Sequence, residues 1–79
     1  MIYPRGAWVF EISRHARAKA CQKMITQDMI NQTLASGEMA WFGKNYVRFR
    51  RRYGRRSVTC VGERKQGNVI KVMTVGWGV

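Results

Sequence analysis

The sequence predicts an α+β domain in which two N-terminal helices pack on a twisted antiparallel sheet of about four strands. Two observations lead to this prediction. Between residues 13 and 37 the apolar residues recur with a period near 3.6, and beyond Gly37 the period changes to two. The runs of period two are separated by short segments that contain Gly, and short connections join antiparallel neighbours. Because such a sheet would otherwise leave its apolar side in water, the two helices are expected to cover one face.

The segment before the sheet is predicted to hold a lead-in and two helices. Residues 7–12, "AWVFEI", alternate weakly and indicate either a short first strand or an ordered lead-in. Ser13 stands at the N-cap of a first helix, expected over residues 14–24. Thr26 is placed to cap a second helix, which Gly37 ends.

Four runs rich in β-branched and aromatic residues predict the strands: "EMAWF", "NYVRFRRRY", "RSVTCVG" and "NVIKVMTVGW". Residues 69–75 of the last run are apolar on both sides apart from Lys71 and Thr74, which is typical of a central or doubly covered strand. A lysine in such a strand must reach solvent, a carboxylate or a bound anion. We expect one domain over residues 1–79, with its core in 12–77.

The charge of the chain is strongly one-sided. It has 15 Lys and Arg against 4 Asp and Glu, a formal net charge of +11 in 79 residues. Such a charge destabilises a compact state by self-repulsion, so a partner that neutralises it is expected. Nucleic acid is the first candidate and an anionic membrane surface the second.

Other classes of protein are disfavoured by what the sequence lacks. No apolar stretch approaches the roughly 20 residues of a spanning helix, and the patch at residues 7–10 is too short for a signal peptide. Cys21 and Cys60 are too few for a disulfide framework, and one His leaves no zinc site. We therefore expect a soluble cytoplasmic protein with reduced thiols, no metal, no cofactor and no membrane partner.

The charge is most concentrated in residues 48–56, "RFRRRYGRR", which holds six arginines in nine positions. Alternation along a strand places Arg48, Arg50 and Arg52 on one face about 7 Å apart, near the spacing of phosphates along a nucleic-acid strand. The alternative is an edge strand that charge protects from aggregation, but one or two cations suffice for that. The predicted nucleic-acid contacts are Lys23, Lys44, Arg48, Arg50, Arg52, Arg55, Arg56 and Lys71.

His15 is the only histidine and lies one residue inside the first predicted helix. It shares a helix surface with Lys19 and, one turn further on, Lys23. One interpretation is a surface histidine with no task; the other is a general acid or base, because imidazole titrates near neutral pH. The sequence alone leaves both open.

The pattern "SRHARAKACQKMITQDMINQTL", followed by a basic meander and "VIKVMTVGW", resembles the domain of unknown function family 4258. His15 matches the family pattern, Lys19 and Lys23 stand where it has arginines, and Thr74 falls at the threonine of its last strand. Met24 replaces the usual glycine. The family is similar to the RelE-like and colicin-type (barnase–EndoU–colicin) ribonuclease toxins, which place two helices ahead of a twisted antiparallel sheet.

This resemblance implies a metal-independent endoribonuclease toxin of a toxin–antitoxin or related mobile-element system. Metal-free RNA cleavage needs a proton acceptor, cations and an acid, so the expected catalytic residues are His15 as base or acid and Thr74 as a positioning hydroxyl. The candidate cationic clamps are Lys19, Arg48, Arg50 and Lys71. The implied partners are RNA, such as tRNA or mRNA, and an acidic antitoxin or immunity protein. The alternative is a non-catalytic nucleic-acid-binding or protein-interaction module, which the basic surface would serve equally well.

Overall fold

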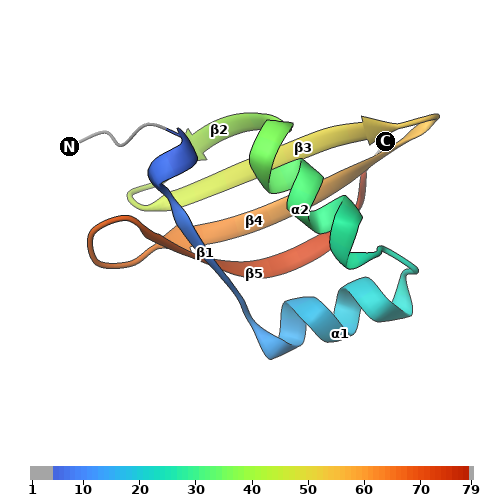
Figure 1. The fold of residues 1–79 in the computed structure, drawn as a ribbon, viewed down its shortest axis with the longest axis horizontal. Helices are drawn as coiled ribbons and strands as arrows, with labels where there is room; N and C mark the ends of the chain where they lie inside the picture. Colours follow the sequence, from blue (N-terminus) through green and yellow to red (C-terminus); the bar gives the residue numbers. More distant parts are fainter. Residues whose placement is uncertain (1–4, 79) are drawn as a thin grey trace.

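The computed structural model describes residues 5–78, so residues 1–4 and 79 of the predicted domain lie outside the described part. Two helices and five strands follow one another along this part of the chain (Figure 1). A short 3-10 helix, Arg5–Ala7, comes first. The other elements are β1 (Val9–Ile12), α1 (Arg14–Gln22), α2 (Gln27–Ser36), β2 (Glu38–Phe42), β3 (Tyr46–Tyr53), β4 (Arg56–Arg64) and β5 (Val69–Gly78).

The five strands form one open sheet in the order β1-β5-β4-β3-β2. Strands β2 to β5 are the predicted antiparallel meander. Five strands are compatible with the prediction of about four, but the prediction of an antiparallel sheet was wrong at its edge. There β1 pairs with β5 in parallel, from Val9 opposite Val69 to Ile12 opposite Val72. The chain makes this pairing by leaving β1 through the two helices and returning to it only at its last strand, a long-range contact that periodicity does not reveal.

Helix α1 begins as predicted and ends earlier. The Ser13 side chain accepts a hydrogen bond from the backbone N–H of Ala16 at 3.1 Å. The predicted end at residue 24 was wrong, since the helix stops at Gln22. Met24 has a φ of 60° and the N–H of Ile25 donates to the carbonyl of Ala20 at 2.8 Å, a left-handed helix termination that glycine usually supplies.

Helix α2 is capped by Thr26, whose hydroxyl accepts from the N–H of Met29 at 3.2 Å. Gly37 ends the helix as predicted, but in an extended conformation (φ −69°, ψ 163°). A Cβ at this position would lie 2.5 Å from the Thr33 carbonyl oxygen and 2.9 Å from that of Arg50. Glycine is required here because α2 and β3 approach closely, rather than because the backbone turns left-handed.

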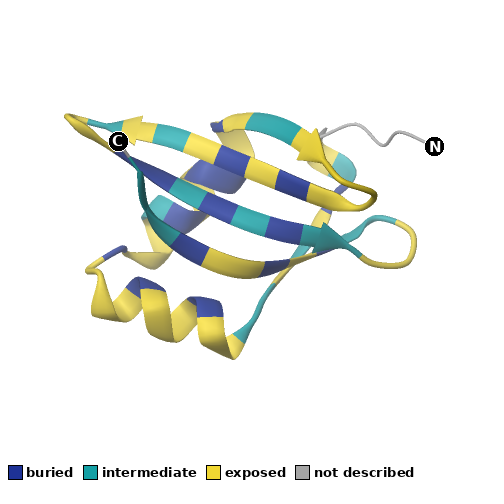
Figure 2. Cartoon of the chain, turned by 180° about the vertical axis from the view of Figure 1, so that it is seen from behind, coloured by how far each residue is buried: buried dark blue, intermediate teal, exposed yellow. Residues whose placement is uncertain are grey.

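The helices lie on one side of the sheet, and the core lies between the helices and the sheet. α2 crosses β3 and β4, whereas α1 lies alongside β5 (Figure 1). Seen from the other side in Figure 2, buried and exposed residues alternate along β3. The largest buried core side chains of the sheet are Val47, Phe49, Val58, Cys60, Ile70, Val72 and Val75. No helix among residues 5–78 is long and apolar enough to cross a membrane.

Strand β5 is central, as predicted, but only one of its faces is covered. Its register shifts at a bulge, where Val61 pairs with Thr74 and Gly62 with Val72. Met73 and Thr74 are consequently both exposed on the side away from the helices, and so is Lys71. We call this uncovered side of the sheet the open face.

Candidate nucleic-acid interface

The arginines of β3 divide between the two faces of the sheet as the alternation predicts. Val47 and Phe49 are buried against the helices, whereas Arg48, Arg50 and Arg52 are exposed on the open face. Alternate residues of a strand lie about 7 Å apart, so the three guanidinium groups form a row that can follow successive phosphates.

Arg51 belongs to the helix side of the sheet and has a structural task. Its Nη1 donates to the Ser36 hydroxyl at 3.0 Å, at the end of α2, and its guanidinium lies 5.4 Å from the centre of the Tyr53 ring. The Tyr53 hydroxyl in turn donates to the carbonyl of Met29 at 3.3 Å. Arg51 and Tyr53 therefore hold α2 on the sheet.

Helix α1 lies beside the half of β5 that β1 leaves unpaired. Strand β1 is opposite residues 69–72 only. The N–H of Ser13 donates to the carbonyl of Val72 at 3.0 Å, and the indole Nε1 of Trp77 donates to the carbonyl of Lys23 at 2.8 Å. Because these bonds fix both ends of the helix, α1 runs in the same direction as residues 73–76, with its first turn at the start of that segment.

Three basic side chains, His15, Lys19 and Lys23, lie on the flank of α1 that borders the open face. Arg17 and Cys21 line a depression shared with α2, so that flank faces the second helix. At 100° per residue, His15, Lys19 and Lys23 occupy the opposite flank, and all three are exposed. A Cβ added to Gly76 would lie 3.2 Å from the Lys23 Nζ. The lysine thus reaches around β5 onto the open face.

A strip of small residues separates these cations from the arginine row. Thr59 of β4 pairs with Arg50 on one side and with Gly76 on the other, and Thr74 precedes Gly76 on the same strand. A Cβ on Gly78 would lie 3.1 Å from the Thr59 hydroxyl oxygen, which places Gly78 on the same face. We call Thr59, Thr74, Gly76 and Gly78 the central strip. Because glycine has no side chain, a ligand can approach the backbone closely at Gly76 and Gly78.

The structure therefore brings together most of the predicted site residues. His15, Lys19, Lys23 and Thr74 lie along β5, and the arginine row lies two strands away on β3. Sequence reasoning missed Thr59, Gly76 and Gly78. Their small size at alternate positions was a visible signal, but only the strand register shows that they fall between two cationic borders.

The remaining predicted cations lie further from this centre. Lys44 is in the β2–β3 turn and Arg55 in the β3–β4 turn, at opposite ends of β3. Arg56 opens β4, at the start of the predicted run "RSVTCVG", and its guanidinium lies 4.1 Å from the Trp77 ring centre. Stacking of this kind holds a guanidinium in place while leaving its N–H groups available.

Lys71 has acidic neighbours in the sheet. It is in register with Glu11 of β1 and with Glu63 of β4. Glu63 also accepts from Lys65 at 2.8 Å. The acidic neighbours reduce the positive potential at Lys71, as Glu38, the register partner of Arg50 on β2, does at that arginine.

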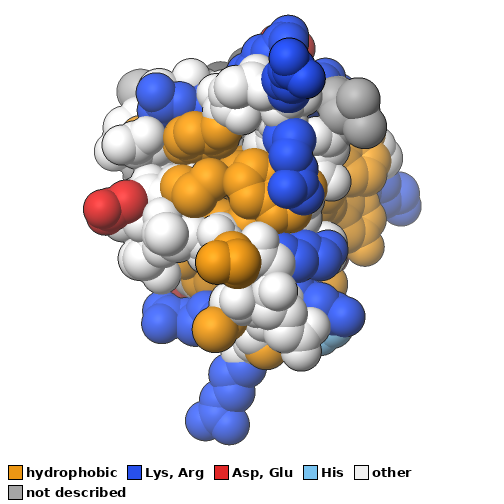
Figure 3. Space-filling model, turned by 90° about the vertical axis from the view of Figure 1, so that its right-hand side faces the viewer, with side chains coloured by type: hydrophobic (Ala, Val, Ile, Leu, Met, Phe, Trp, Pro, Cys, Tyr) orange, Lys and Arg blue, Asp and Glu red, His pale blue; other side chains and the backbone are white. Residues whose placement is uncertain are grey.

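Figure 3 shows the end of the molecule with the β3–β4 turn and the α1–α2 connection, where Lys and Arg predominate over acidic side chains and border an apolar area. Among residues 5–78, no three His, Cys, Asp or Glu side chains are close enough together to hold a metal ion. Burial raises the pKa of the Cys60 thiol to about 12, so this thiol is neutral and does not react.

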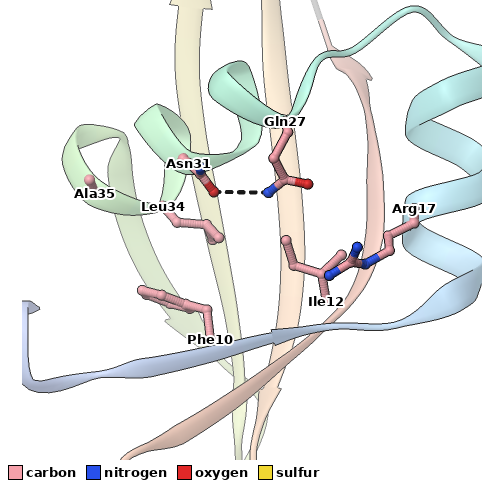
Figure 4. A pocket seen from close by; sticks show the side chains of 7 residues that line it. All are labelled: Phe10, Ile12, Arg17, Gln27, Asn31, Leu34 and Ala35. Atoms are coloured by element: carbon pink, nitrogen blue, oxygen red, sulfur yellow. Dashed lines mark hydrogen bonds between the residues drawn. The ribbon is translucent and has the colours of Figure 1, made fainter.

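A second depression, of about 320 Å³, lies between β1, α1 and α2 (Figure 4). Phe10, Ile12 and Leu34 supply its apolar wall. At its rim the side-chain amide of Gln27 donates to the Asn31 oxygen at 2.9 Å. Arg17 is the one ionisable side chain among its lining residues, so this depression offers no group for proton transfer near neutral pH.

Comparisons of the chain with protein-family models, with curated proteins and with solved structures gave no match. The resemblance to family 4258 therefore rests on the residues quoted for it, and the toxin function that it implies stays a prediction.

Proposed function

We propose that the protein binds RNA on the open face of its sheet and cleaves the RNA backbone without a metal ion, as an endoribonuclease toxin of a toxin–antitoxin or related mobile-element system. One observation carries the proposal. Two cationic borders from distant parts of the sequence, the arginine row of β3 and the His15, Lys19 and Lys23 flank of α1, enclose the central strip on a single face. The resemblance to RelE-like and colicin-type toxins implies RNA binding at this same face or along this helix.

The chemistry needed is an intramolecular transesterification, in which the phosphoryl group of the RNA backbone passes from a 5′-oxygen to a 2′-oxygen. The 2′-oxygen of one ribose forms a bond to the adjacent phosphorus, and the bond from phosphorus to the 5′-oxygen of the next ribose breaks. The products are a 2′,3′-cyclic phosphate and a 5′-hydroxyl. In this scheme His15 takes the proton of the 2′-hydroxyl, and the departing 5′-oxygen takes a proton from water.

The other residues stabilise and position the phosphate. Lys19 is one helical turn from His15, about 6 Å between Cβ atoms, which suits a cation facing the charge that develops on phosphorus. The Thr74 hydroxyl, in the central strip, can hold a phosphate oxygen or the 2′-hydroxyl. Arg48 and Arg50 hold the neighbouring phosphates and so fix the register of the strand.

The enzymatic proposal is tested with purified protein, total RNA and excess EDTA. We expect wild-type protein to cut RNA and to leave an oligonucleotide with deoxyribose at the cleavage position intact. His15→Ala should lower the rate at least about 100-fold, the usual contribution of a general base, while RNA affinity changes less than about threefold. Arg14→Ala removes an exposed cation next to His15 and should leave cleavage nearly unchanged.

A non-catalytic RNA-binding module is the second candidate, and one observation favours it. The chain offers a single imidazole, so no second histidine is available as the acid, and only Glu11, Glu38 and the tyrosines remain as alternatives. If wild-type protein leaves RNA uncut in EDTA and its expression is harmless to the host, the enzymatic proposal fails and the binding module stands. An acidic antitoxin or immunity protein would dock on the same cations and form a salt-sensitive heterodimer.

A further inference from the structure

Two aromatic side chains are exposed on the open face at the β2–β3 turn. Phe42 is 48% exposed and Tyr46 39% exposed. They are register partners on adjacent strands, and their rings stack with centroids 5.7 Å apart and planes 20° apart. More than a third of each residue therefore remains exposed to a ligand, although burial would be favourable.

This aromatic pair stands in line with the arginine row. Tyr46 and Arg48 are alternate residues of β3, so the ring is followed on the same face by three guanidinium groups at steps of about 7 Å. Lys44 lies in the turn between the two aromatic residues. The open face thus presents a stacking surface at one end and a series of phosphate contacts that leads away from it.

We propose that the ligand of the open face is single-stranded RNA, with a base stacked on the Phe42–Tyr46 pair and the following phosphates held by Arg48, Arg50 and Arg52. In a duplex the base faces are already stacked on one another, and the major groove of A-form RNA is too narrow for a sheet to enter. Unpaired bases expose their π faces, and stacking on aromatic side chains accepts every base. A protein partner could also bury two rings, but a net charge of +11 and the arginine row favour a polyanion.

The inference rests on the proposed RNA binding, and the experiment separates the two. Fluorescence anisotropy measures the affinity of the wild-type protein for a labelled single-stranded RNA of about 12 nucleotides and for the same strand annealed to its complement. The double variant Phe42→Leu/Tyr46→Leu keeps apolar bulk and removes the rings. The control is Trp41→Leu, which removes an exposed aromatic ring from the opposite face of β2. On that face the ring centroids of Trp41 and Trp8 are 5.6 Å apart.

We expect the single strand to bind at least about tenfold more tightly than the duplex at equal salt. The double variant should lose between about fivefold and a hundredfold in affinity for the single strand, the range measured for one stacked base. Its salt dependence should match that of the wild type, because no phosphate contact is removed. A 2-aminopurine base in the RNA should lose fluorescence on binding to the wild type and to Trp41→Leu, but not on binding to the double variant.

Other outcomes would overturn the proposal. Equal affinity for single strand and duplex, or an unchanged affinity of the double variant, would refute the stacking site while leaving RNA binding intact. Absence of binding to any RNA would refute the proposed function as well. If light scattering shows that the wild-type protein dimerises and that the double variant is monomeric with unaltered RNA affinity, the aromatic pair is a contact between copies of the chain and the stacking site is refuted.

Discussion

Replacement of the arginine row by glutamine gives the most quantitative test of the interface. The variant Arg48→Gln/Arg50→Gln/Arg52→Gln removes three charges from exposed positions and leaves a shorter polar side chain at each. Glutamine is tolerated in a strand, and the hydrogen bond from Arg52 Nε to the Gly54 carbonyl at 2.9 Å is lost. The free energy of unfolding should therefore change by less than about 1 kcal/mol, which urea unfolding verifies.

The magnitude follows from counterion release. Each phosphate contact on a single strand contributes roughly 0.7 to the slope of log affinity against log salt concentration, so the three arginines together contribute about 2. Between about 50 and 200 mM salt the wild-type affinity should accordingly fall about 20-fold more than that of the triple variant. Anisotropy titrations with a labelled single-stranded RNA at four or more salt concentrations measure both slopes.

A matched control separates contact from net charge. Arg14→Gln/Arg17→Gln/Lys65→Gln also removes three charges, from the outer side of α1, its α2 flank and the β4–β5 turn. This control should retain nearly the wild-type slope. If both triple variants lower the slope equally, the arginine row holds no phosphate and only the total charge of the protein matters.

Four further predictions concern stability and reactivity. Met24→Gly should raise the free energy of unfolding by about 0.5–1 kcal/mol, because glycine adopts the left-handed conformation at lower cost, and a lower urea midpoint than wild type would contradict this. Gly37→Ala should lower the same free energy by about 2–3 kcal/mol, since its Cβ would meet two carbonyl oxygens, and an unchanged midpoint would show that α2 and β3 can separate. At pH 8 a thiol reagent should modify exposed Cys21 quickly and buried Cys60 only after unfolding. The pKa of Cys60 is raised from 9.0 to about 12, so its contribution to stability is complete below about pH 9 and is lost as the pH rises from 9 to 12. Urea midpoints of wild type and Cys60→Ala, measured across that pH range, test this loss.

The local features of the fold were predictable because they depend on neighbours in the sequence. Ser13 and Thr26 cap the helices as expected, and the alternation along β3 put Arg48, Arg50 and Arg52 on one face. The end of α1 was missed since Met24 is an unusual residue for a left-handed termination.

The long-range features were not predictable from periodicity. The parallel pairing of β1 with β5 joins segments about sixty residues apart in the chain, and four residues of weak alternation do not identify a partner. The central strip depends on the register of β4 against β5, including the bulge between Val61 and Gly62, which a local pattern does not reveal. His15 was recognisable as a residue type, but its place beside the open face follows only from the docking of α1.

The docking of α1 also has a consequence for how the protein avoids polymerising. Among residues 5–78, no strand pairs with this edge of β5 beyond Val72, and an uncovered strand edge can recruit a strand from another molecule. The helix occupies that edge, tied down at Ser13 and at Lys23. Helix α1, which is proposed to bring His15 to RNA, therefore also protects the protein from aggregation through this edge. Mutations that loosen α1 from β5 are expected to yield insoluble protein rather than a folded, inactive one.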